Sequence, residues 1–205
     1  MSIDALFEQL KHPNPHLRDR AMWELAELED ETIIPRLMSA LDEDNTTYRR
    51  AAVKTLGAVG PETIPPLVEA MLNSENVTVR GSAVKALAQV AICYPEIPFL
   101  EAGLQGLAKA LNDLNPVVNI AAVMALGEIG STQAFDILLN TFETTDNIAL
   151  SVAIANAFGS IKDTRGAEVL QKIIDDESVE GYVRESAVSA LSRLELVMKN
   201  QLPDR

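Results

Sequence analysis

The octapeptide Arg49–Leu56, RRAAVKTL, decides the fold because closely similar octapeptides recur along the chain. RDRAMWEL begins at Arg18 and RGSAVKAL at Arg80, each thirty-one residues from Arg49. Three more copies follow after steps of thirty-nine, thirty-two and thirty-three residues: NIAAVMAL from Asn119, SVAIANAF from Ser151 and RESAVSAL from Arg184. A repeat of this period predicts a series of stacked supersecondary units.

All six copies share one apolar face. Their fourth position holds Ala21, Ala52, Ala83, Ala122, Ile154 or Ala187, and their eighth holds Leu25, Leu56, Leu87, Leu126, Phe158 or Leu191. Positions four apart lie on one face of an α-helix, and a small residue there lets a neighbouring helix approach closely. A shorter apolar segment precedes these helices, most clearly at Thr32–Leu41 and Thr63–Leu72. Each unit is therefore predicted to be a helix hairpin that buries its apolar face against the next one.

These hairpins predict an all-α fold, a right-handed α-α superhelix of about six hairpins in a single domain over residues 1–205. The predicted repeats cover approximately residues 1–29, 30–60, 61–91, 92–130, 131–161 and 162–200. The long step inserts eight residues, Ile92–Phe99. Because Pro95 and Pro98 disfavour a continuing helix, we expect a longer connection there. The column of Gly57, Gly127 and Gly159 is expected to mark close helix packing.

Two columns of polar residues are expected to be structural. Four residues before five of the octapeptides stand Asn14, Asn45, Asn76, Asn115 and Asn147, and asparagine is a preferred N-cap because its side chain accepts a hydrogen bond from an unpaired backbone N–H. At the first position, Arg18, Arg49, Arg80 and Arg184 are expected to bond turn carbonyls or acids of a neighbouring repeat. Asn119 and Ser151 interrupt this column. The interruption indicates either a binding surface with a cationic half and an apolar, acidic half, or sequence drift.

Composition excludes several classes of protein. Of 205 residues 47% are hydrophobic, so a disordered chain is excluded, and the net charge of −13 would repel a phosphate backbone. The single cysteine excludes an internal disulfide, and no apolar run reaches the ~20 residues of a membrane span. The acidic start at Met1–Leu10 is unlike a signal peptide. We therefore expect a soluble, cytoplasmic protein without nucleic-acid binding or membrane insertion.

The residues show no self-contained catalytic site. His12 and His16 have metal-ligand spacing only on a continuous helix, which Pro13 and Pro15 interrupt, so a solvated turn is expected. Cys93 lacks the electropositive setting of a reactive thiol and is expected to be a structural, buried or half-buried residue. No catalytic or metal-binding residue is predicted.

The repeat resembles a known family. A proline-bearing first helix followed by R-x-x-A-x-x-x-L is similar to a HEAT repeat, so the fold is expected to be a HEAT-like α-solenoid. The phrasing Ala52-Val53-Lys54, Leu56-Gly57, Gly60, Pro65 and Leu67 resembles the E–Z branch, which is named after subunits of phycobiliprotein bilin lyases. In size the chain is most similar to the small Z-type subunit associated with phycoerythrin lyases.

This resemblance implies a bilin lyase subunit or a lyase-associated chaperone that assists chromophore attachment to, or folding of, a phycobiliprotein subunit. It implies no permanently bound cofactor and at most a transient linear tetrapyrrole (bilin), and it leaves open whether the chain is an enzyme and whether a second lyase subunit is needed. A cytoplasmic location beside the thylakoid would follow. The alternative is a non-catalytic protein–protein adaptor without a cofactor, including a role in phycobilisome turnover.

A binding surface is predicted from the helical wheel. Two columns of the second helices should face outward, one turn apart, and the second helix of an α-solenoid hairpin commonly lines the partner-binding surface. The candidate residues for a bilin or protein partner are Trp23, Arg50, Lys54, Lys85, Ile120, Met124 and Val152. The cations would attract carboxylates, and Ile120, Met124 and Val152 would be exposed apolar residues that a partner covers. An alternative for Trp23 is that it caps the N-terminal end of the stack.

Overall fold

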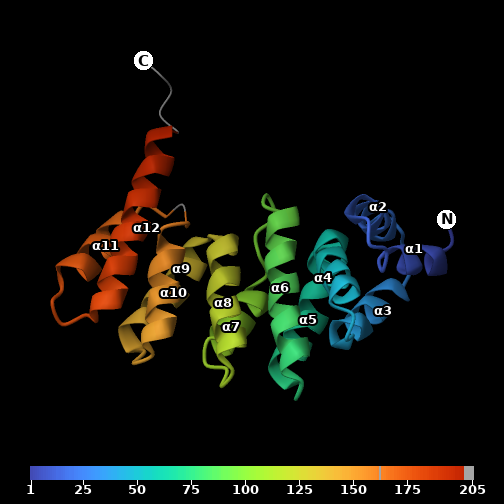
Figure 1. Ribbon diagram of the computed structural model, residues 1–205, viewed down its shortest axis with the longest axis horizontal. Helices are drawn as coiled ribbons and strands as arrows, with labels where there is room; N and C mark the ends of the chain where they lie inside the picture. Colours follow the sequence, from blue (N-terminus) through green and yellow to red (C-terminus); the bar gives the residue numbers. More distant parts are fainter. Residues whose placement is uncertain (162, 201–205) are drawn as a thin grey trace. The chain divides into compact units, whose positions relative to one another are not determined.

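The structure, a computed structural model, describes residues 1–161 and 163–200. Within these ranges the chain forms twelve α-helices and two short 3-10 helices, and no strand (Figure 1). The helices make six consecutive hairpins: α1 (Ile3–Gln9) with α2 (Pro15–Ala26), α3 (Ile33–Ser39) with α4 (Thr46–Val59), α5 (Ile64–Asn73) with α6 (Val77–Cys93), α7 (Glu101–Ala110) with α8 (Pro116–Ile129), α9 (Thr132–Thr144) with α10 (Ile148–Phe158), and α11 (Gly166–Asp175) with α12 (Gly181–Asn200). The 3-10 helices are Ala40–Asp42 and Pro61–Thr63. The predicted all-α hairpin architecture is confirmed.

The helices form two compact units, one of Met1–Ala125 and one that begins at Leu126, so the division falls inside α8. In the first unit α2 packs on α4, α4 packs on α6, and α5 packs on α6 and α7. In the second unit α12 packs on α10 and α11, and α9 packs on α10. The assignment of residues 1–205 to one domain stays a prediction.

The repeated apolar face is the core of each unit. In the first unit the fourth- and eighth-position residues are fully buried: Ala21, Leu25, Ala52, Leu56, Ala83, Leu87 and Ala122. In the second unit the same is true of Leu126, Ile154, Phe158 and Ala187, and the Phe158 ring packs on Phe135 at 4.9 Å between centroids. Leu191 of α12 is only half-buried. Burial of these side chains drives hairpin stacking, since a lone hairpin would leave them in water.

The asparagine column caps the second helices, as predicted. The Oδ1 atoms of Asn14, Asn45, Asn76, Asn115 and Asn147 accept hydrogen bonds from backbone N–H groups of the first turn, at 2.8–3.2 Å. A second column, two residues earlier, was not predicted. His12, Ser74, Asp113 and Thr145 accept a hydrogen bond from the backbone N–H of the following asparagine. Four of the five turns are therefore held by two successive side-chain caps, whereas the turn at Asn45 has the asparagine cap alone.

Three of the four first-position arginines bond turn carbonyls, as predicted; the exception is Arg184, whose buried Nε has no hydrogen-bond partner among the described residues. Arg18 donates to the carbonyl of His12 at 2.6 Å, Arg80 donates to that of Ser74 at 3.1 Å, and Arg49 donates to that of Glu43. In each case the acceptor lies six residues earlier. Asn119 Nδ2 donates to the carbonyl six residues before it, at 3.3 Å from the Asp113 oxygen. The column therefore keeps its structural role at Asn119, although the cation is lost there.

The inserted connection is confirmed. Helix α6 ends at Cys93 and α7 begins at Glu101, and the seven residues between them are not helical. The Tyr94 hydroxyl donates to the carbonyls of Ala58 and Val59 at 2.7 and 3.3 Å, which ties the connection to the end of α4.

Close helix approach is confirmed at two of the three predicted glycines. A Cβ atom on Gly57 would collide with Gln89 Cβ, and one on Gly159 would lie 2.7 Å from the Ala190 carbonyl oxygen. A Cβ atom on Gly127 would meet Ala157 Cβ at 3.6 Å, an ordinary contact distance.

Candidate functional site

Four of the predicted binding residues form one column on the second helices of the first unit. Trp23 on α2, Lys54 on α4, Lys85 on α6 and Met124 on α8 occupy the same position of successive repeats, and all four are exposed. Trp23 keeps 51% of its surface exposed and Met124 keeps 65%. We call these four residues the exposed column. It has an aromatic and a thioether residue at its ends and two ammonium groups between them.

The cations of this surface have few internal partners. Arg50 and Lys85 make no hydrogen bond or ion pair with another residue in the part of the chain that the structure describes. Lys54 has one long ion pair, with 4.0 Å between its Nζ and Asp19 Oδ1, and both side chains are at least half exposed. A pair this long and this exposed contributes little to stability. Arg50 and Lys85 are therefore free to bind an external anion, and Lys54 can do so by giving up one weak partner.

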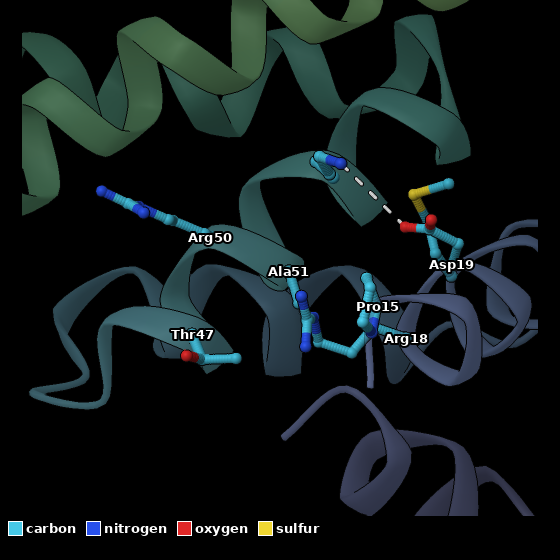
Figure 2. Close-up of a pocket in the computed structure, with 8 residues that line it drawn as sticks. Pro15, Arg18, Asp19, Thr47, Arg50 and Ala51 are labelled. Carbon is cyan, nitrogen blue, oxygen red and sulfur yellow. Dashed lines mark ion pairs between the residues drawn. The ribbon is translucent and has the colours of Figure 1, made fainter. Parts of the chain in front are cut away.

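A hollow of about 220 Å³ lies between α2 and α4 beside the exposed column (Figure 2). Its lining residues are Pro15, Arg18, Asp19 and Met22 from α2 and Thr47, Arg50, Ala51 and Lys54 from α4. Three cations against one carboxylate make it locally positive on a chain whose net charge is −13. Figure 2 shows Arg50 pointing away from Asp19, so its guanidinium is not occupied by that carboxylate. The hollow can accept a carboxylate group.

The other outward-facing column is less exposed than the helical wheel predicts. Arg50 is exposed, but Ile120 and Val152 are half-buried, and Gly81 of the same column is buried. Val117 of α8 lies 3.9 Å from the position that a Gly81 Cβ would take. A Cβ atom would fit at this distance, so Gly81 is buried by the approach of α8 to α6, and this column turns toward the contact between neighbouring helices.

The first unit brings together Trp23, Arg50, Lys54, Lys85, Ile120 and Met124 on its second helices, whereas Val152 belongs to the second unit. That all seven residues bind one partner stays a prediction. The prediction did not include Asp19, which pairs with Lys54. It also did not include Met22 and Thr47, which line the hollow. Asp19 and Lys54 lie on different helices. Their positions within the repeat, the second and the sixth, differ by one helical turn, and this was the only signal in the sequence for the contact.

Trp23 lies on the same column as Lys54, and its indole has no hydrogen-bond partner among the described residues. The competing role, a cap on the N-terminal end of the stack, would bury the ring against the chain. Its exposure of 51% favours an external partner instead.

The reactive side chains elsewhere are engaged in structural roles. His12 Nδ1 accepts a hydrogen bond from the Asn14 N–H at 3.0 Å, and no continuous helix joins His12 to His16, as predicted. Cys93 is half-buried, as predicted, and burial raises the pKa of its thiol, which disfavours the nucleophilic thiolate. Among the described residues no three His, Cys, Asp or Glu side chains group as a metal site, and no described helix is long and apolar enough to cross a membrane.

Known proteins match both the sequence and the fold. A family model of HEAT repeats matches residues 3–88, 34–105 and 104–192. The uncharacterized phycocyanin operon protein Z of Pseudanabaena tenuis (strain PCC 7409) is 58% identical over 197 residues, 96% of this chain and 97% of that protein. Bilin biosynthesis protein CpeZ of Synechococcus sp. (strain WH8020) is 31% identical over 117 residues, 55% of this chain and 62% of that protein.

Two solved structures show the same fold at low sequence identity. One is in the complex of CpcE and CpcF of phycocyanin lyase from Nostoc sp. PCC7120, with a TM-score of 0.51, 21% identity and coverage of 76% of this chain and 96% of that one. Human deoxyhypusine hydroxylase gives a TM-score of 0.53, 19% identity and coverage of 95% and 84%. The resemblance inferred from the repeat phrasing is confirmed by the two sequence relatives. The chain therefore belongs to the HEAT-repeat proteins and, within them, to the family of the phycocyanin operon protein Z.

Proposed function

We propose that this protein assists the attachment of a bilin to a phycobiliprotein subunit, as a subunit of a bilin lyase or as a chaperone associated with one. The observation that carries the proposal is the 58% identity with phycocyanin operon protein Z over nearly the full length of both chains. The match to a bilin biosynthesis protein, although it covers 62% of that protein, supports the same chemistry.

The chemistry of the exposed column suits a bilin or an acidic protein. A bilin carries two propionate groups on an extended conjugated system, so cations beside an aromatic ring are complementary to it. Lys54 and Lys85 of the column and the adjacent Arg50 supply the cations, and Trp23 and Met124 supply apolar surface. Partner contacts made by large exposed side chains of this kind often dominate binding energy.

The reacting thiol would come from the phycobiliprotein. The single cysteine of this chain, Cys93, has a thiol whose pKa is raised by burial, so it is poorly suited to attack a bilin. The role left to this chain is to hold the bilin and the acceptor subunit together in a productive orientation, which can itself accelerate a reaction.

Co-expression tests the proposal. A phycobiliprotein subunit and bilin-producing enzymes are expressed with and without this chain, and covalent bilin fluorescence on the acceptor is measured after denaturing electrophoresis. We expect the chain to raise the yield of labelled acceptor. If the acceptor binds the chain but its labelling is unchanged, the chain is an adaptor without a cofactor role.

Charge reversal tests the exposed column. The double variant Lys54→Glu/Lys85→Glu should slow association with the acceptor subunit roughly tenfold at low salt and weaken its salt dependence. The matched control is Lys109→Glu/Lys172→Glu, which changes the net charge equally at two exposed positions on the first helices α7 and α11. Trp23→Ala and Met124→Glu should mainly speed dissociation. Equal effects of the two double variants would contradict the assignment of the site.

A further inference from the structure

The first unit has a second distinctive surface, at the edge where three second helices end. The ends of α2 and α4 meet there, because residues 25–30 and Val59 and Glu62 line one hollow. The ends of α4 and α6 meet there as well, because the Tyr94 hydroxyl binds the carbonyls of Ala58 and Val59. The segments 26–34, 59–63 and 91–100 therefore form one continuous edge, which we call the acidic edge.

The hollow in this edge has an apolar floor and an acidic rim. Its volume is about 350 Å³. Ile34 and Val59, both half-buried, supply the part of the floor that a ligand can touch, whereas Leu25 and Ile33 are fully buried. The rim carries four exposed carboxylates: Glu27, Glu29, Asp30 and Glu62. An apolar floor below carboxylates suits a lysine or arginine side chain, whose methylene stem packs on apolar surface while its charged head stays at the rim.

Exposed apolar side chains continue this surface beyond the hollow. Leu28 is exposed at its rim, and Ile92, Ile97 and Leu100 are exposed along the connection that follows α6. Ile97 keeps 48% of its surface exposed, although its N–H donates to the Tyr94 carbonyl at 3.1 Å and thereby holds it in an ordered turn. Pro95 and Pro98 restrict the same turn. A held turn that displays apolar side chains resembles a preorganised contact surface.

The charge of the acidic edge has one sign. Its three segments contain six carboxylates, Glu27, Glu29, Asp30, Glu31, Glu62 and Glu96, and no lysine, arginine or histidine. The nearest arginines along the chain are engaged elsewhere: Arg20 pairs with Glu24 at 2.7 Å and Arg36 pairs with Asp4 at 2.9 Å. This surface would repel nucleic acid and anionic lipid and attract a cationic partner. It is opposite in sign to the exposed column.

We propose that the acidic edge docks a basic, amphipathic segment of a protein partner. This segment inserts a lysine or arginine into the hollow at the ends of α2 and α4, the one rimmed by carboxylates, and its apolar residues pack on Leu28 and Ile97. The segment would bring cations to the rim carboxylates and cover the exposed apolar side chains, which is the usual way in which an amphipathic helix binds a groove. The inference does not depend on the proposed function, because it uses a different surface. It gives the protein two docking sites of opposite charge.

A peptide probe tests this inference on the whole chain. The probe is a fluorescein-labelled peptide of about eighteen residues, with leucines on one helical face and lysines on the other. Its binding is measured by fluorescence anisotropy, together with that of a scrambled peptide of the same composition. We expect the amphipathic peptide to bind at least about tenfold more tightly than the scrambled one, because only the first presents apolar and cationic faces together.

Variants locate the binding. Glu27→Lys/Glu29→Lys should weaken binding about tenfold, and Ile97→Ser should weaken it severalfold. The matched control is Glu69→Lys/Glu75→Lys, two exposed acids away from the edge, which should change the affinity less than about twofold. Lys54→Glu/Lys85→Glu should not weaken binding, which separates this result from the test of the exposed column. Circular dichroism verifies that every variant is folded.

Three results would overturn the proposal. Equal weakening by the two acidic double variants would mean that only net charge attracts the peptide. Equal affinity for the scrambled peptide would remove the role of the apolar side chains. Concentration-dependent self-association of the unmodified chain that Glu27→Lys/Glu29→Lys abolishes, measured by sedimentation, would show that a second copy occupies the edge.

Discussion

The ion pair between Arg80 and Asp113 should be the strongest polar link between the third and fourth repeats. Arg80 Nε and Nη2 donate to the two carboxylate oxygens of Asp113 at 2.7 and 3.1 Å, and Nη1 donates to the carbonyls of Ser74 and Glu75 at 3.1 Å. The two side chains are only 18% and 12% exposed. Asp113 also accepts from the Asn115 N–H, so the pair joins α6 to the turn before α8.

The structure sets the expected cost of Arg80→Met. The substitution removes the two hydrogen bonds to Asp113, each typically worth ~1.5–3 kcal/mol, together with the two to the carbonyls of Ser74 and Glu75, and it leaves a carboxylate with little access to water. Removal of one partner from a fully buried pair costs ~3–5 kcal/mol, and the residual exposure of this pair lowers that figure. We therefore expect Arg80→Met to lower the free energy of unfolding by about 2–4 kcal/mol. Arg49→Met is the matched control, because Arg49 bonds the Glu43 carbonyl and Thr46 but pairs with no described carboxylate. It should cost about 0.5–1.5 kcal/mol.

Urea unfolding followed by circular dichroism measures the stability of the single variants and of Arg80→Met/Asp113→Asn. The double-mutant cycle should give a coupling free energy of about 1–3 kcal/mol between the two residues. A coupling below about 0.5 kcal/mol, or equal costs for Arg80→Met and Arg49→Met, would refute the reasoning that the buried ion pair links these repeats.

Three other predictions follow from local geometry. Asn45→Ala removes an N-cap that accepts hydrogen bonds from two backbone N–H groups at 3.0 and 3.1 Å. It should lower the free energy of unfolding in urea by about 0.5–2 kcal/mol without changing partner affinity. Lost binding with unchanged stability would contradict a purely structural role. Gly57→Ala should destabilise the first unit by about 1–3 kcal/mol because its methyl group would collide with Gln89, whereas Gly127→Ala should be neutral or stabilising by up to about 1 kcal/mol in thermal melts. The hydrogen bond from Arg80 lowers the pKa of Asp113 below its ordinary value of 3.8. The ionised carboxylate therefore adds to folding stability above pH 3.8, and this stability is lost as the pH falls through the pKa of Asp113 in the folded protein. Acid titration of stability should therefore be shallower in Arg80→Met, and identical curves for the two proteins would argue against the linkage.

The sequence by itself determined the repeat architecture. The spacing of four between Ala52 and Leu56 places both on one helix face, and the asparagines four residues before the octapeptides mark the helix starts. Capping and helix periodicity act within a few residues of chain, so the pattern of residues is sufficient to predict them. The break after α6 was predictable for the same reason, since Pro95 and Pro98 act on their own backbone and its neighbour.

Only the tertiary structure decided which outward-facing residues are accessible. The helical wheel treats Arg50 and Ile120 as equivalent, yet Arg50 is exposed and Ile120 is half-buried. The contacts of Lys54 with Asp19 and of Tyr94 with Ala58 likewise join different helices. The physical reason is that the period of 3.6 residues defines directions around one helix axis, whereas the distance to the next helix depends on the side chains of both. At Gly81 the approach of α8, with Val117 in contact range, buries a position that the helical wheel places outward, and one predicted surface column turns toward a helix contact.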